Sequence, residues 1–190
     1  MVVRRNIILF ALLILCYTCK AQNLNWLNPY KVNCYSIGVN EQICAVEPYI
    51  VLKDNLLVVT DVTMVYCSVY KNGELRFLLL TFHFDVTYFP CSKQDCSVKI
   101  GLKFKDGSYY ELDKDIEAID KVIYVYAIRD GDVTPYGSTI LTEMAKHNLE
   151  EIQIEVEHKE KGIMLTFLPV SEKDDTNIHF TLLKTEELVK

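Results

Sequence analysis

Several stretches of this chain alternate strictly between apolar and polar side chains, and this pattern constrains the fold more than any other feature. Between residues 98 and 105, four apolar side chains point one way and lysines point the other. Residues 152–158 repeat the pattern: Ile152, Ile154, Val156 and His158 alternate with Gln153, Glu155 and Glu157. A period of two is typical of β-strands that have one buried and one wet face. The alternation therefore predicts antiparallel sheets, which commonly cover a core on one side only.

Tight turns are expected between these strands. Asn72-Gly73 and Asp106-Gly107 are dipeptides that suit two-residue hairpin turns, because Asn, Asp and Gly tolerate positive φ. Strands are predicted at residues 65–70, 75–88, 98–105, 109–112, 122–128, 152–158, 163–168 and 177–183. Two of them, 75–88 in its first half and 122–128, are apolar on both faces, which predicts central strands.

Helix signals are scarce. Residues 139–148 are the best helix candidate, with Ser138 as the N-cap. Residues 113–120 are predicted to form a turn of helix or a loop. Half of the residues are hydrophobic, so a disordered chain is excluded. The predicted fold class is mainly β: an antiparallel β-sandwich or barrel of about eight to nine strands with one short helix.

The first 21 residues have the pattern of a secretory signal peptide. Arg4 and Arg5 precede an apolar run over residues 7–17, and Ala21 ends a short stretch typical of a cleavage site. The apolar run is shorter than the ~20 residues that a membrane-spanning helix needs. We therefore expect cleavage after Ala21, secretion of residues 22–190 as a single β-rich domain, and no membrane span in the mature chain. No Asn lies in an acceptor motif for an N-linked glycan.

Secretion predicts disulfides in the mature chain, which retains five cysteines. They are Cys34, Cys44, Cys67, Cys91 and Cys96. Cys34 and Cys44 flank a turn and are candidates for a bridge across a hairpin, and Cys91 and Cys96 are candidates for a local bridge. Pairing of Cys67 with Cys34 or Cys44 stays open, because spacing does not fix connectivity. If Cys67 is unpaired, we expect a buried thiol on the same strand face as Val65 and Val69, rather than a disulfide between two chains.

No catalytic constellation is recognisable, so the chain is not predicted to be an enzyme and no cofactor or metal site is predicted. His83 and Asp85 share a face of one predicted strand, but no nucleophile motif accompanies them. Residues 129–132 resemble a fragment of an acidic metal loop, yet the remaining ligands of an EF-hand are absent. A solvated turn is expected there. A secreted hydrolase using His83 is the third-ranked hypothesis.

Charge narrows the partners that the chain is expected to have. The net charge is −6, and all charges in residues 1–21 are positive, so the mature chain is more acidic still. Such a chain is a poor candidate for binding nucleic acid or anionic membranes.

The leading hypothesis is an extracellular binding module that acts through protein–protein contacts, with its site on loops 90–95 and 130–137. The candidate residues there are Lys93, Asp95, Asp130, Asp132 and Tyr136. The alternative is a carrier of a small hydrophobic ligand in a barrel or sandwich cavity. In that case Tyr66, Tyr124 and Tyr126 are the hydroxyls expected to orient the ligand.

Overall fold

The computed structural model describes residues 28–53, 61–84 and 95–189. The predicted signal peptide therefore lies outside the described residues. Among the described residues, no helix has both the length and the apolar character that crossing a membrane requires.

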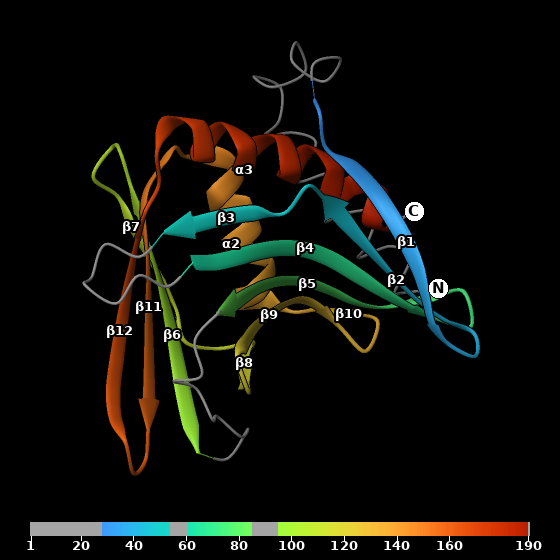
Figure 1. The fold of residues 1–190 in the computed structure, drawn as a ribbon, viewed down its shortest axis with the longest axis horizontal. Helices are drawn as coiled ribbons and strands as arrows, with labels where there is room; N and C mark the ends of the chain where they lie inside the picture. Colours follow the sequence, from blue (N-terminus) through green and yellow to red (C-terminus); the bar gives the residue numbers. More distant parts are fainter. Residues whose placement is uncertain (1–27, 54–60, 85–94, 190) are drawn as a thin grey trace.

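The fold is mainly β and contains two antiparallel sheets (Figure 1). The larger sheet has eight strands in the order β1-β2-β4-β5-β9-β10, with β3 also paired to β4 and β8 to β9. Its strands are β1 (Lys31–Gly38), β2 (Glu41–Glu47), β3 (Ile50–Lys53), β4 (Asp61–Lys71), β5 (Glu74–Phe84), β8 (Ile116–Ile119), β9 (Val122–Arg129) and β10 (Asp132–Val133). The predicted central positions of β5 and β9 are confirmed.

The smaller sheet has four strands in the order β12-β11-β6-β7. They are β12 (Gly162–Pro169), β11 (Leu149–His158), β6 (Cys96–Phe104) and β7 (Tyr109–Leu112). Figure 1 shows these strands running crosswise to those of the larger sheet. The arrangement is sandwich-like, and the larger sheet does not close into a barrel. The sandwich form of the predicted fold is thus confirmed, with more strands than expected.

Two helices cover part of the inner face of the larger sheet. Helix α2 (Pro135–Lys146) packs mainly on β9, and α3 (Glu172–Thr185) leads into a 3₁₀ turn, η3 (Glu186–Val189). One continuous buried cluster joins the inner faces of both sheets to these helices. Its fully buried side chains come from both sheets and both helices. Examples are Val62, Phe82 and Ile123 of the larger sheet, Ile100 and Ile154 of the smaller sheet, and Ile140 and Ile178 of the helices.

The turn predictions have mixed outcomes. Asn72 and Gly73, with φ of 53° and 76°, form the expected tight turn, since Lys71 pairs with Glu74. The Asp106-Gly107 connection is wider than predicted: β6 ends at Phe104, β7 begins at Tyr109, and the Phe104 N–H donates to the Ser108 carbonyl. Here the Asp106 carboxylate accepts from Ser108 N–H instead of allowing the shorter turn.

Three local predictions are wrong. Residues 177–183 are helical rather than a strand, because α3 begins at a good cap: Ser171 accepts a hydrogen bond from Asp174 N–H. Helix α2 begins at Pro135, so Ser138 is not its N-cap. The segment 113–120 contains β8, which pairs with β9 instead of forming a helical turn.

Candidate functional site

The outer face of the larger sheet, opposite the core, carries a second apolar cluster. Its buried members are Ala45, Val65, Cys67, Leu79 and Tyr126. Side chains of Ile43, Val69, Phe77 and Tyr124 pack against them. This is why β4, β5 and β9 are apolar on both faces: one face contributes to the main core, and the other builds this surface.

Strand register aligns these side chains into rows across the sheet, since directly opposed residues share a face. The rows are Tyr35–Ile43–Val69–Phe77, Ala45–Cys67–Leu79–Tyr126, Val65–Thr81–Tyr124 and Thr63–His83. The alternation of each strand thus becomes a continuous apolar surface that extends from β1 to β9.

This surface is hollowed into an open groove of about 520 Å³, which we call the sheet groove. Its lining residues are Tyr35, Ile43, Ala45, Tyr49, Thr63, Val65, Cys67, Val69, Leu79, Thr81, His83 and Tyr124. Ala45, Val65, Cys67 and Leu79 are each at most 9% exposed and form the floor. Tyr35 and Tyr49 are about half exposed, at 49% and 46%, and form a wall.

One wall of the sheet groove is fixed by the Glu47 carboxylate. It accepts hydrogen bonds from Asn33 Nδ2 at 2.7 Å, Tyr35 Oη at 2.8 Å and Tyr49 Oη at 3.1 Å. These donors, with Asn33 first, lower the pKa of Glu47, so it is a stable anion at neutral pH. Because both hydroxyls bind the same oxygen, the two tyrosine rings are held in place before any partner arrives.

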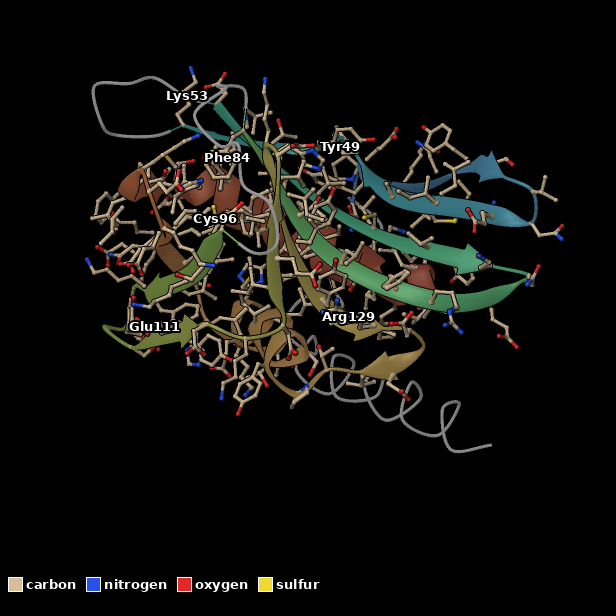
Figure 2. All side chains as sticks on the ribbon, turned by 90° about the horizontal axis from the view of Figure 1, so that it is seen from below. Tyr49, Lys53, Phe84, Cys96, Glu111 and Arg129 are labelled. Atoms are coloured by element: carbon tan, nitrogen blue, oxygen red, sulfur yellow. A yellow bond between two sulfur atoms is a disulfide. The ribbon has the colours of Figure 1, made fainter. Side chains whose placement is uncertain are left out.

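A second carboxylate lies at the other end of the apolar cluster, on β8. Glu117 accepts a hydrogen bond from Tyr126 Oη at 2.9 Å and forms an ion pair with Arg129. The Arg129 guanidinium also stacks over the Tyr126 ring, 4.5 Å from its centroid. In Figure 2, Arg129 lies well apart from Tyr49, so the two polar groups flank the apolar surface at different ends.

The polar groups inside the sheet groove are neutral. His83 Nε2 lies 2.9 Å from Thr81 Oγ1, and burial lowers the pKa of His83. Cys67 is a free thiol whose pKa is raised to about 12 by burial. Asp85, the expected partner of His83, lies outside the described residues. The sheet groove is therefore suited to hold apolar groups by contact, with hydroxyls and an imidazole available for a few hydrogen bonds.

A second hollow, of about 600 Å³, lies on the other side of the β1–β2 hairpin. Most of its lining is polar and comes from β1 and β2, such as Ser36 and Gln42, and from the turns at Asn40 and Asn72. It lacks the rows of apolar side chains that distinguish the sheet groove.

The cysteine predictions are largely confirmed. Cys34 and Cys44 are directly opposed on β1 and β2 and form a disulfide. Cys67 is unpaired and buried, as expected, so its pairing with either of them is wrong. Cys96 is in a disulfide, while Cys91, its predicted partner, lies outside the described residues.

The predicted loop 130–137 is not one loop. Asp130 and Gly131 form the turn between β9 and β10, Asp132 begins β10, and Tyr136 lies in the first turn of α2. The Tyr136 N–H donates a hydrogen bond to Asp115 Oδ2 at 3.0 Å, which attaches this segment to the rest of the fold. None of these residues lines the sheet groove.

The other predicted loop lies mostly outside the described residues. Lys93 is among the residues not described, and the Asp95 carbonyl accepts a hydrogen bond from Lys159 N–H. Asp95 precedes β6 in the smaller sheet and is not part of the sheet groove.

The three tyrosines predicted to orient a ligand do not converge. Tyr66 is 1% exposed in the main core, where its hydroxyl lies 3.8 Å from Met144 Sδ. Tyr124 and Tyr126 are on the outer face of the same sheet, with their rings 6.4 Å apart. Sequence reasoning missed Tyr35, Glu47 and Tyr49. A signal existed in Tyr35, next to Cys34 in the hairpin, and in Tyr49, just after the hairpin ends, but their convergence on Glu47 depends on strand register.

Comparison with protein-family models, with curated proteins and with solved structures gave no match. The functional argument therefore rests on the geometry of the sheet groove.

Proposed function

We propose that this chain is a secreted binding module that holds an apolar segment of an extracellular protein in the sheet groove. The observation that carries the proposal is the apolar cluster on the outer face of the larger sheet. Contiguous apolar surface of this kind marks interaction sites on proteins that otherwise keep such side chains in the core.

The walls of the sheet groove favour a protein partner. Tyrosines are enriched at binding hot spots, because they offer a large contact area with few rotatable bonds. Tyr35 and Tyr49 are already held by Glu47, so binding would cost little of their side-chain entropy. The groove is an open hollow on the sheet surface and not an enclosed cavity, whereas small-molecule sites enclose most of their ligand. An open apolar surface suits a partner that brings its own surface to cover it.

Charge indicates the chemistry of the partner segment. The Glu47 carboxylate lies at one end of the apolar surface, while Glu117 at the other end is balanced by Arg129, and the whole chain has a net charge of −6. A segment with apolar side chains and a Lys or Arg at the Glu47 end complements this arrangement, while an acidic segment would be repelled.

A peptide-display selection on the immobilised protein tests the site. Binders selected on the unmodified protein should lose affinity at least about tenfold with Tyr35→Ala or Tyr49→Ala, the loss typical of a hot-spot tyrosine. Tyr136→Ala is the matched control, since Tyr136 is similarly exposed, at 44%, but lies off the groove. Binders that tolerate both groove variants and fail with Tyr136→Ala would transfer the site to residues 130–137.

A second candidate function is the carriage of a small apolar ligand, which the groove volume of about 520 Å³ favours because ligand sites fall in this range. Native mass spectrometry of the purified protein distinguishes the two functions. A co-purified organic mass that is lost in Tyr49→Ala would support the carrier function and count against the first proposal.

Secretion is part of the same proposal, supported by the signal-peptide pattern and compatible with the Cys34–Cys44 disulfide. Expression in a secreting cell line should yield a chain in the medium whose N-terminus is Gln22. A product retained in the cell with Met1 or the next residue at its N-terminus would contradict it.

A further inference from the structure

Strand β12 differs from every other described strand in carrying no charged side chain. It lies at the end of the four-stranded sheet and is paired on one side, with β11. Exposed edge strands normally carry charges, prolines or bulges that prevent further pairing. The one proline of β12, Pro169, lies at its last position. Among the described strands, β11 is the one that pairs with β12, and β3 contacts β12 without pairing, so the second edge of β12 is available to another strand.

The outer face of β12 is apolar as well as uncharged. Ile163 is 62% exposed and Leu165 is 46% exposed, and Phe167 continues their row. The neighbouring strand β11 has the opposite character, with Glu157 opposed to Ile163 and Glu155 opposed to Leu165. The charged side chains next to β12 thus lie on β11, where Glu155 pairs with Lys99 of β6 at 3.1 Å. The exposed face of the edge strand β12 itself is apolar.

We propose that β12 pairs antiparallel with β12 of a second copy of this chain, about a two-fold axis at Leu165. In this register Leu165 lies opposite Leu165 of the partner subunit, and Ile163 lies opposite Phe167 of the partner subunit. Apolar pairs of this kind are favourable cross-strand neighbours. The two four-stranded sheets then form one continuous sheet with an apolar seam.

The sequence of β12 selects a second copy over an unrelated strand. Its exposed row, Ile163–Leu165–Phe167, has an apolar residue at each position and is centred on Leu165, so the strand is complementary to itself, as a two-fold interface requires. Two copies with a net charge of −6 repel each other over most of their surfaces, and the uncharged strand is where this repulsion is smallest.

Sedimentation velocity of the secreted chain tests the association. An interface of one strand pair is small, so we expect a reversible dimer that dissociates on dilution from about 200 to about 1 µM. Leu165→Lys places two like charges beside the axis and should weaken the dimer at least about tenfold. Val39→Lys is the control, because Val39 is 91% exposed in the β1–β2 turn and should leave the dimer unchanged. A monomer at every concentration would overturn the proposal.

Disulfide trapping tests the register independently of affinity. Leu165→Cys places two thiols directly opposite each other at the axis, so oxidation should give a covalent dimer on a non-reducing gel. Ile163→Cys is the matched control, since its thiol faces Phe167 of the partner subunit and should cross-link poorly. The opposite ranking, or equal cross-linking of both variants, would overturn the register. Tyr49→Ala should leave the dimer intact, so failure of the groove proposal and failure of this one are distinguishable.

Discussion

Cys67 shows how the sheet groove protects a reactive residue. Its thiol lies among Ala45, Val65 and Leu79 and is 4% exposed. Burial raises its pKa to about 12, because the thiolate would lose its hydration. A thiol in this state can persist unpaired in an oxidising compartment, since the thiolate is the species that attacks disulfides.

The chemical consequence is measurable. We expect the folded protein to react with an aromatic disulfide reagent at pH 7.5 on the order of a thousandfold more slowly than the urea-unfolded protein, whose thiolate fraction is ordinary. The time course of absorbance at both conditions measures the ratio. Cys67→Ser should abolish labelling in urea, which identifies the residue. Complete labelling of the folded chain within minutes would show that the groove floor is open.

At the scale of elements, helix α2 lies unusually close to β9. A β-carbon added at Gly137 would clash with the carbonyl group of Tyr126, and Thr134 Oγ1 donates a hydrogen bond to the same carbonyl oxygen. Asp115 holds the helix start from the other side by accepting from the N–H groups of Tyr136 and Gly137. The glycine therefore sets the distance between helix and sheet.

Gly137→Ala should lower the free energy of unfolding by about 2 kcal/mol or more, because the helix must move away from β9 to make room. Urea denaturation followed by circular dichroism measures the change. Ser138→Ala, at a half-buried neighbouring position, is the control and should stay within about 0.5 kcal/mol of the unmodified protein. Equal urea midpoints for the two variants would contradict the close approach.

Whether a segment is a strand or a helix was predictable where its apolar side chains followed a single period. The strict alternation of residues 98–105 and 152–158 fixed β6 and β11, and apolar character on both faces identified β5 and β9 as central. In α3, by contrast, Ile178, Phe180 and Leu182 alternate by chance, and this pattern favoured a strand. Ser171 with Glu172, Asp174 and Asp175 was the stronger signal, because an N-cap followed by acidic residues marks a helix start.

The sheet groove was predictable only in part. Its floor follows from strands that are apolar on both faces. Its wall does not, because the approach of Tyr35 and Tyr49 to Glu47 requires the pairing of β1 with β2 and the return of the chain after Glu47. Sequence spacing does not reveal which strands become neighbours.

For the whole molecule, two histidines make stability depend on pH. Burial lowers the pKa of His179 in α3 despite the Asp175 carboxylate 3.7 Å away, and burial also lowers the pKa of His83. When the folded pKa of a histidine is below its ordinary value of 6.5, the unfolded chain takes up the proton first. Stability from these residues is complete above pH 6.5 and decreases as the pH falls through 6.5 toward the lower folded pKa.

We therefore expect the urea midpoint to be lower at pH 5.5 than at pH 7.5. His179→Gln should reduce this difference, because glutamine does not titrate, and adding His83→Asn should reduce it further. Parallel urea titrations of the three proteins at both pH values provide the measurement. A midpoint that rises on acidification would contradict the assigned direction.

The Cys34–Cys44 bridge has a consequence for where such a molecule can work. It staples the hairpin at the margin of the larger sheet, and that hairpin supplies Tyr35, Ile43 and Ala45 to the sheet groove. Cytosolic reductants would reduce this disulfide. Strand β1 could then separate locally from the sheet, since among the described strands it pairs with β2 alone. The smaller sheet and the main core would stay folded. Reduction would therefore disorder one wall of the sheet groove before the fold is lost, so the binding that we propose requires an oxidising compartment.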